Sequence, residues 1–181
     1  MKQFFILAAL AAFTAAASAA ELNQNLLPNG DFEAGNEFFN YSTGRMDGLS
    51  VVPSTDFLSG EKSLKIVKKA NAWIAVQAKN PLPVIPGKTI HLTFWMKSAK
   101  GTVPGSATID FSQPVQNHHL YKTFNFQIEP EWKEFSFEYA VPADVEAHTG
   151  LKAGLCRLRF GLKNSADEAE AYLDGIEFVL K

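Results

Sequence analysis

Residues 72–78 combine an aromatic ring and a polar amide on one side of a predicted β-strand. Trp73 and Gln77 fall on one side of the alternation, and Ile74 and Val76 on the other. Because successive side chains of a strand point to opposite faces, the apolar pair predicts the buried side. The indole offers flat apolar area and the amide can hydrogen-bond a hydroxyl group, as in many small-molecule sites. Trp73 and Gln77 are therefore predicted to point outward, where they could contact a ligand, with edge or core packing of Trp73 as the alternative.

Two arginines occupy a similar alternating segment. Arg157 and Arg159 alternate with Leu158 and Phe160, so both guanidinium groups are predicted side by side on one outer face. Each guanidinium carries several hydrogen-bond donors, which suits contact with a polar ligand. Pairing with surface carboxylates is the alternative.

Tyr121 and His119 precede another alternating segment. If strand pairing is unbroken, both side chains point away from Phe124 and Phe126. Lys122 violates this pattern if the side of Phe124 is buried, so a β-bulge is a further expectation here.

The sequence lacks the common catalytic signatures. Glu134 and Glu138 share a strand face, as two glycosidase carboxylates could, but the phenylalanines between them indicate an ordinary solvated surface. The GxSxG and HExxH motifs are absent. We predict a non-catalytic protein, and an enzyme that uses Tyr121, His119 and an arginine for proton transfer is the catalytic alternative.

Cys156 is the only cysteine, so no intrachain disulfide can form. It shares the side of its segment with Leu158, Phe160 and Leu162. We predict a buried and inert thiol, because apolar surroundings disfavour the reactive thiolate.

Period-two alternation recurs along the chain, and turn-forming Gly, Pro and Asn residues separate the segments. No amphipathic helix of convincing length is present. Many short alternating strands predict an all-β fold, an antiparallel β-sandwich or barrel. The predicted strands include 63–67, 72–78, 91–97, 107–111, 124–128, 135–139 and 171–180.

Length and charge exclude several classes of protein. The 181 residues fit one domain, and 46% of them are hydrophobic, which suffices for a sizeable core. Seventeen Lys and Arg oppose 19 Asp and Glu, a formal charge of −2. Such a balance argues against binding nucleic acid through phosphate neutralisation.

The first twenty residues have the pattern of a secretory signal peptide. Lys2 supplies a positive start, residues 4–13 are apolar without a charge, and residues 17–19 read Ala-Ser-Ala. The apolar run is shorter than the roughly 20 residues that span a bilayer. We expect cleavage near residue 20, a mature domain over 21–181, a secreted or periplasmic location and no membrane partner.

Three stretches together resemble a known family. They are Asn25–Gly35 (NLLPNGDFEAG), Ser59–Ile66 (SGEKSLKI) followed by Trp73, and Ala171–Phe178 (AYLDGIEF). Their order and spacing are similar to those of carbohydrate-binding modules of families four, nine and twenty-two. The resemblance implies a jelly roll of the galactose-binding-like kind.

The resemblance also implies a structural calcium ion. Carried over by position, Glu33 and Asp174 would supply carboxylates, and Asp31 and Lys62 would supply main-chain carbonyls. Mixed oxygen ligands suit calcium. Without the ion, Asp31 and Asp174 would be turn residues and Glu33 a solvated one.

The function implied is binding of a polysaccharide, β-glucan or xylan being plausible, by stacking sugars on aromatic rings. The candidate ligand-binding residues are Trp73, Gln77, His119, Tyr121, Arg157 and Arg159. Trp95 is left open between such a role and shelter under a loop, and Trp132 is predicted to be structural. One alternative is a secreted structural or interaction protein that keeps the sandwich without affinity for glycans. The other is a small jelly-roll polysaccharide lyase that uses Tyr121, His119 and an arginine.

Overall fold

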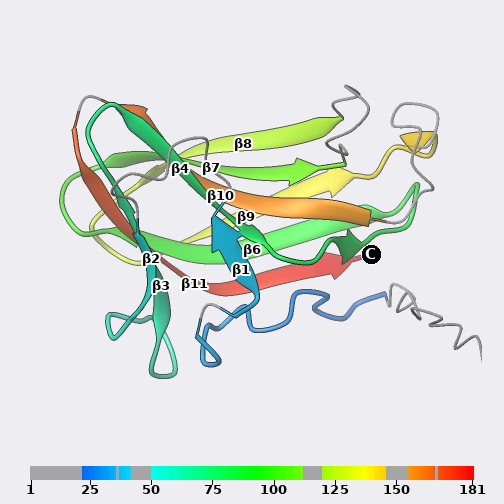
Figure 1. The fold of residues 1–181 in the computed structure, drawn as a ribbon. Helices are drawn as coiled ribbons and strands as arrows, with labels where there is room; N and C mark the ends of the chain where they lie inside the picture. Colours follow the sequence, from blue (N-terminus) through cyan, green and yellow to red (C-terminus); the bar gives the residue numbers. More distant parts are fainter. Residues whose placement is uncertain (1–21, 36, 42–49, 112–119, 146–154, 166) are drawn as a thin grey trace, which may run out of the picture.

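The computed structural model describes residues 22–35, 37–41, 50–111, 120–145, 155–165 and 167–181. The predicted signal peptide and His119 lie outside these residues. The described chain forms two antiparallel β-sheets packed face to face (Figure 1). No helix in this part of the chain is long and apolar enough to cross a membrane.

Each sheet is named here after two of its central strands. The β4–β10 sheet has the order β1 (Phe39–Tyr41), β4 (Ala72–Ala78), β10 (Leu155–Ser165), β7 (Val103–Asp110) and β8 (Tyr121–Ile128), with β5 (Leu82–Pro83) also paired to β10. The β6–β11 sheet has the order β2 (Ser50–Ser54), β3 (Ser63–Lys68), β11 (Ala169–Leu180), β6 (Thr89–Ser98) and β9 (Lys133–Ala140). This arrangement confirms the predicted antiparallel sandwich.

Phenylalanine rings fill the space between the two sheets. Phe94 of β6 is fully buried, and its ring centroid lies 4.8 Å from that of Phe160, 5.4 Å from that of Phe126 and 5.5 Å from that of Phe135. These rings come from both sheets, so their contacts hold the layers together through apolar burial and ring packing.

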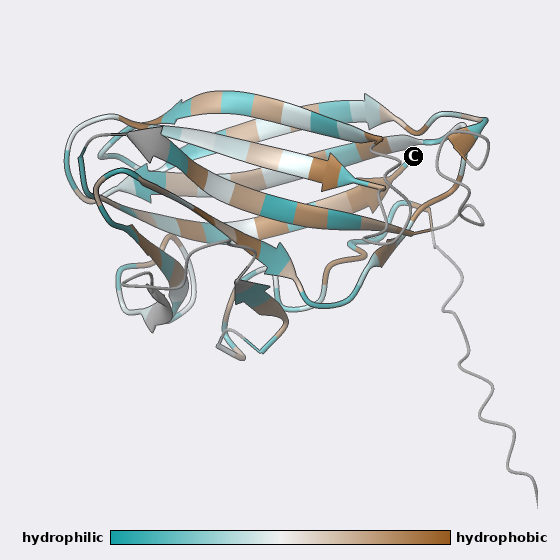
Figure 2. Ribbon diagram, turned by 45° about the horizontal axis from the view of Figure 1, so that its top comes forward, coloured by the Kyte–Doolittle hydropathy of each residue, from teal (hydrophilic) through white to brown (hydrophobic). Residues whose placement is uncertain are grey.

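The predicted alternation is confirmed on the strands that matter for the site. Ile74 and Val76 are fully buried, whereas Trp73 is 50% exposed. Figure 2 shows the alternation as hydrophilic and hydrophobic bands along the strands. Cys156 is buried as predicted, and burial raises the pKa of its thiol far above the usual range.

The expected bulge near Lys122 is wrong. The pairing of β7 with β8 runs unbroken from Asp110 opposite Tyr121 to Val103 opposite Ile128. Lys122 keeps the phase of Phe124 but is exposed, and its amine lies 5.6 Å from the Phe124 ring centroid. A long amine at an edge strand can reach water from the apolar side, so the ladder needs no extra residue.

The N-terminal segment runs along the last strand (Figure 1). The Asn25 side chain donates to the Ile176 carbonyl at 3.1 Å and accepts from the Phe178 N–H at 3.0 Å. The amide of Ile176 in turn donates to the Gly30 carbonyl at 2.9 Å. These bonds bring the segment that carries Glu33 to the strand that carries Asp174.

Candidate functional site

The outer face of the β4–β10 sheet carries most of the predicted binding residues. Gln77, Arg159, Thr108 and Thr123 lie opposite one another in register across four strands. The hydroxyl oxygens of the two threonines are 3.0 Å apart. The row therefore presents amide, guanidinium and hydroxyl groups side by side on one surface.

The adjacent row consists of small residues and forms the floor of a hollow. Ala75, Gly161 and Ser106 face one another across β4, β10 and β7. A Cβ atom on Gly161 would lie 3.0 Å from the Ser106 hydroxyl oxygen and 3.2 Å from the Ile74 carbonyl oxygen. Because these residues have no large side chains, the surface is recessed at this row.

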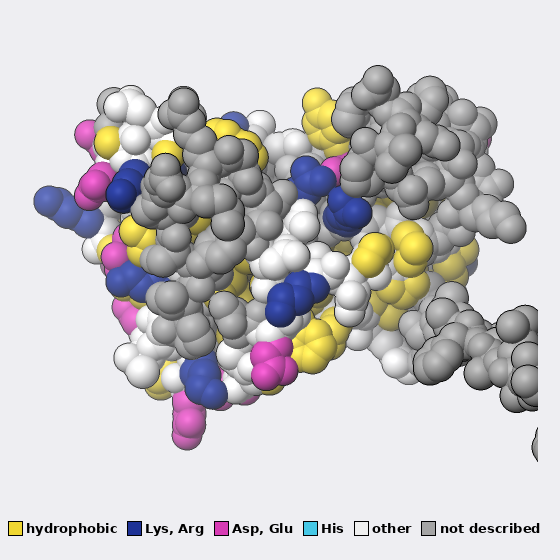
Figure 3. Space-filling model, viewed as in Figure 1, with side chains coloured by type: hydrophobic (Ala, Val, Ile, Leu, Met, Phe, Trp, Pro, Cys, Tyr) yellow, Lys and Arg dark blue, Asp and Glu magenta, His cyan; other side chains and the backbone are white. Residues whose placement is uncertain are grey.

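The hollow above this floor has a volume of about 450 Å³, which is typical of small-molecule sites. Trp73, Thr108, Arg159 and Lys163 are among the side chains that line it. Figure 3 shows Lys and Arg side chains bordering the polar area in the middle of the face that Figure 1 presents. The hollow thus combines a half-exposed indole with hydrogen-bond donors and acceptors.

An ion pair lies further along the same face. The Arg159 guanidinium is 2.5 Å from the Asp110 carboxylate, whose side chain is 8% exposed. The Nε atom of Arg159 is buried and has no hydrogen-bond partner among the described residues. Asp110 therefore neutralises Arg159 without satisfying all of its donors.

The structure brings some predicted residues together and separates others. Arg157, Asp110 and Tyr121 lie opposite one another in register, and the Tyr121 side chain is 59% exposed. Tyr121 lies roughly 25 Å from Trp73, from three strand spacings across the sheet and six residues along it. The two exposed rings are therefore suited to an extended ligand rather than to one sugar.

Sequence reasoning missed several residues of this face. Ser106, Thr108 and Asp110 have the outward phase of β7, opposite Ala107 and Ile109, so alternation could have placed them. Lys163 continues the outward phase of the two arginines. Its position beside Trp73 depends on the pairing of β4 with β10, which no local pattern encodes.

A second cluster surrounds the loop between β2 and β3. The Asp174 side chain is fully buried and accepts hydrogen bonds from the Leu58 and Ser59 amides at 2.9 and 3.3 Å, and from the Gly175 amide at 2.7 Å. Burial raises the pKa of Asp174 against these bonds, and the nearby Glu33 charge raises it further. The carboxylate thus fixes the loop at an electrostatic cost.

Glu33 holds the other half of the same loop. Its Oε1 atom accepts from the Glu61 amide at 2.8 Å and from the Lys62 amide at 3.0 Å, and these bonds lower the pKa of Glu33. Gly60 has a φ of +74°, and a Cβ atom there would lie 2.3 Å from Glu33 Oε1. Glycine is therefore needed at this position on both counts.

The cluster contains oxygens suited to a cation. Glu33 and Asp174 converge as predicted, and none of the hydrogen bonds within the described chain uses Glu33 Oε2. Asp31 lies exposed in the adjoining turn, and the Lys62 amine donates to the Glu33 main-chain oxygen at 2.7 Å. The described residues contain no group of three or more His, Cys, Asp or Glu side chains around one point, so a metal would need main-chain oxygens as well. The donor set, hard oxygens around two close carboxylates, fits calcium.

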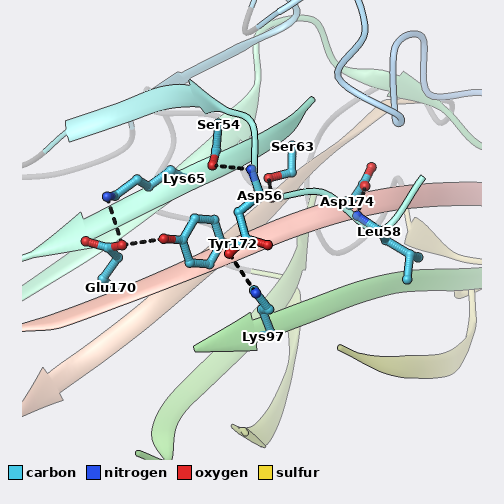
Figure 4. Close-up of polar contacts among 9 residues, drawn as sticks. All are labelled: Ser54, Asp56, Leu58, Ser63, Lys65, Lys97, Glu170, Tyr172 and Asp174. Atoms are coloured by element: carbon cyan, nitrogen blue, oxygen red, sulfur yellow. Dashed lines mark hydrogen bonds and ion pairs between the residues drawn. The ribbon is translucent and has the colours of Figure 1, made fainter. Parts of the chain in front are cut away.

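The outer face of the β6–β11 sheet is arranged differently (Figure 4). Glu170 accepts from the Lys65 amine at 2.8 Å and from the Tyr172 hydroxyl at 2.5 Å, and the Lys97 amine is 2.7 Å from the Asp56 carboxylate. The hydrogen bond that Tyr172 donates to Glu170, and then burial, raise the pKa of Tyr172 to about 12. The polar groups of this outer face are therefore largely engaged with one another.

The other two tryptophans lie on this second face. Trp95 is half-buried on β6, opposite Asp174 and Glu134, and its ring lies beside Gly175. Trp132 is half-buried, and the Lys97 amine lies 5.7 Å from its ring centroid. Both rings are partly covered by neighbours, and neither lines the hollow at Trp73.

Several solved structures with the same fold are carbohydrate-binding modules. A family 16 module is 18% identical with a TM-score of 0.62, over 86% of this chain and 99% of the other. A family 4 module is 15% identical with a TM-score of 0.64, over 86% and 99%. A xylan-binding family 22 domain from Paenibacillus barcinonensis is 17% identical with a TM-score of 0.62, over 83% and 97%. At these identities the likeness shows the jelly-roll fold.

Family membership follows from a match between the sequence and a family model. No match was found among curated proteins. The family model described as "Carbohydrate binding domain", which covers families 4 and 9, matches residues 24–151, more than half of the chain. The chain therefore belongs to this family of carbohydrate-binding domains.

Proposed function

We propose that this chain is an exported, non-catalytic protein that binds a polysaccharide on the outer face of the β4–β10 sheet. The observation that carries the proposal is Trp73, half exposed beside a hollow of about 450 Å³ with a floor of small residues. The apolar face of a pyranose ring can lie on the indole, while hydroxyl groups of the sugar bond to Thr108, Ser106 and Arg159.

The class of ligand is proposed from similar proteins. One similar structure is named as a xylan-binding domain, and another is a family 11 module from Clostridium thermocellum in complex with a β-1,3-1,4-mixed-linked tetrasaccharide. The wide separation of Trp73 from Tyr121 supports a ligand of several sugars. We therefore propose xylan or mixed-linkage β-glucan as the first ligands to test.

The proposed lack of catalysis rests on the family and on the surroundings of the candidate acids. Glu134 and Glu138 are exposed on the outer face of the β6–β11 sheet, away from the hollow. The lyase alternative depends on Tyr121, His119 and an arginine, and His119 lies outside the described residues. Incubation with uronate-containing polymers tests it, since a lyase would release unsaturated products that absorb ultraviolet light.

A bound calcium ion is part of the proposal. Glu33 and Asp174 would hold it with their carboxylates, and Asp31 and Lys62 with main-chain carbonyls. The ion would offset the repulsion between two carboxylates, one of which is fully buried. Because it binds only the folded chain, it would stabilise the fold and its N-terminal segment.

Export is proposed from the first twenty residues, which lie outside the described chain. Expression with this segment, followed by mass determination of the mature protein, tests whether cleavage occurs near residue 20.

Electrophoresis in native gels that contain soluble xylan or mixed-linkage β-glucan tests the binding site. We expect the wild-type protein to be retarded and Trp73→Ala to migrate as in a gel without glycan. Phe57→Ala is the matched control, because Phe57 is an aromatic residue 41% exposed in the loop after β2. Equal migration of wild type and Trp73→Ala in every gel would contradict the site.

Thermal unfolding with calcium and with a chelator tests the ion. We expect a higher Tm with calcium, and no such difference for Glu33→Gln. Lys62→Met keeps the main-chain carbonyl but removes the amine, so it should keep the calcium response. An identical Tm with calcium and with chelator would contradict a calcium site.

A further inference from the structure

The outer face of the β4–β10 sheet has an excess of positive charge. The charged residues at outward positions of its strands β4, β7, β8 and β10 are Arg157, Arg159, Lys163 and Asp110. Three cations thus oppose one carboxylate, although the whole chain has a formal charge of −2. The excess is a local property of this face.

Two of the three cations are not neutralised by the described chain. Asp110 is paired with Arg159 at 2.5 Å. Arg157 lies opposite Asp110 in register but forms no ion pair with any described residue, and the same holds for the exposed Lys163. Their charges are therefore available to a ligand.

The cations form a line along one strand beside the aromatic platform. Outward positions of a strand are two residues apart, so Arg157 and Lys163 are separated by roughly 20 Å along β10. Lys163 and Trp73 line the same hollow, which opens above Gly161. A ligand with regularly repeated negative charges matches such a line better than a ligand with a single charge.

The outer face of the β6–β11 sheet shows no such excess of positive charge, so the excess does not follow from the composition of the whole chain. There Lys65 and Lys97 each pair with a carboxylate, and further exposed carboxylates, Glu134 and Glu177, add negative charge. Positive charge is thus concentrated on the face that holds Trp73.

We propose that this face binds an acidic polysaccharide, one whose sugars carry carboxylates, as uronic acids do. This inference rests on the proposed function and names the ligand of the same site. Arg157 and Lys163 pair with carboxylates of sugars that lie several units apart along the polymer, since guanidinium and ammonium groups form charge-assisted hydrogen bonds with carboxylates. Trp73 stacks on the ring of one of these sugars.

Calorimetric titration with polygalacturonate and with its methyl-esterified form tests the proposal. Esterification removes the negative charge and keeps the sugar backbone. We expect about tenfold tighter binding of polygalacturonate, and the difference should shrink at high salt. Equal affinity for the two polymers would overturn the inference.

Two double variants localise the effect. Arg157→Gln/Lys163→Gln should lose most of the preference for polygalacturonate, whereas Lys69→Gln/Lys100→Gln removes the same charge from exposed positions elsewhere and should keep it. An equal loss in both would show attraction by net charge alone and overturn the site. Dextran sulfate binding as tightly as polygalacturonate would overturn the assignment to carboxylates.

The failure of this inference is distinguishable from failure of the proposed function. If neutral xylan or β-glucan binds through Trp73 without a preference for polygalacturonate, the function stands and the inference fails. If no polymer binds, or if Trp73→Ala binds each of them as wild type does, the proposed function itself fails.

Discussion

The two outer faces of the sandwich are built from the same kind of alternating strand but differ in how their polar groups are satisfied. On the β6–β11 sheet, Lys65, Glu170 and Tyr172 form one network, and Lys97 pairs with Asp56 with its amine over the Tyr172 ring (Figure 4). On the β4–β10 sheet, Trp73 is half exposed beside a hollow, and two cations have no carboxylate among the described residues.

This difference indicates which face serves stability and which is free to bind. Polar groups that bond to one another leave little for a ligand, and a covered ring offers no platform. Exposed aromatic area with unsatisfied donors is what a binding surface requires. The family membership indicates a carbohydrate ligand, and the contrast between the faces supports the position proposed for it.

Substitution of Asp174, on β11 of the β6–β11 sheet, should have the largest effect on stability. Asp174→Ala removes a buried acceptor of three main-chain amides, so the free energy of unfolding should fall by about 3 kcal/mol. Gln77→Ala on the first sheet should stay within about 0.5 kcal/mol of wild type. Urea unfolding with a chelator present measures the hydrogen bonds without a metal contribution. A loss below about 1 kcal/mol for Asp174→Ala would refute the structural role.

The two faces should respond in opposite ways to loss of a tryptophan. Trp73→Ala should weaken glycan binding by about 2 kcal/mol, roughly thirtyfold, with little change in stability, because a half-exposed ring loses little packing. Trp132→Ala should lower stability and leave binding intact. Calorimetry and thermal unfolding of both variants measure the contrast. Reduced binding in Trp132→Ala with none in Trp73→Ala would reverse the assignment of the faces.

Asp110 differs from the other charged groups discussed on the β4–β10 sheet, because its carboxylate is already paired with Arg159. Asp110→Asn leaves Arg159 without its counter-charge, and we expect the free energy of unfolding to fall by about 1–2 kcal/mol. Glu134→Gln, at an exposed position of the other sheet, should change it by less than about 0.5 kcal/mol. Chemical unfolding compares the two. Equal stabilities would mean that the Arg159–Asp110 pair contributes nothing.

The smallest effect should appear in the pH dependence of the free energy of unfolding under acidic conditions. Burial alone would raise the pKa of Glu170, but hydrogen bonds from Lys65 and Tyr172 lower it below its ordinary value of 4.5. The contribution of Glu170 is therefore present above about pH 4.5 and is lost as the pH falls through its lowered folded-state pKa. Glu170→Gln should remove about 1 kcal/mol or less at neutral pH and flatten the profile below pH 4.5. Unfolding curves across this range measure it, and a profile parallel to wild type would contradict the network.

Alternation predicted most of the long strands and their buried sides. It placed Trp73 outward and Cys156 inward because each lies in a segment with clear period two. The short strands β1, β2 and β5 were missed because three-residue and proline-containing segments carry too little pattern. Local sequence thus predicts a strand only where it is long enough to alternate.

The site was predictable only where its residues lie on one strand. The two arginines were placed together from their spacing, but the pairing of Arg159 with Asp110 depends on β10 lying beside β7. The hollow likewise depends on small residues of β4, β10 and β7 meeting in one row. Strand order results from long-range pairing, which no local pattern encodes. The convergence of Glu33 with Asp174 came from the family resemblance alone.

The chain has three tryptophans, one on the proposed binding face and two on the other, so their indole N–H signals test the assignment of the faces directly. Two-dimensional NMR spectra of ¹⁵N-labelled protein, titrated with xylan and mixed-linkage β-glucan oligosaccharides and with oligogalacturonate, would follow all three signals. We expect the Trp73 signal to move with the ligand that binds, while the Trp95 and Trp132 signals stay in place. Movement of the Trp95 or Trp132 signal with the Trp73 signal unchanged would contradict the proposed binding face.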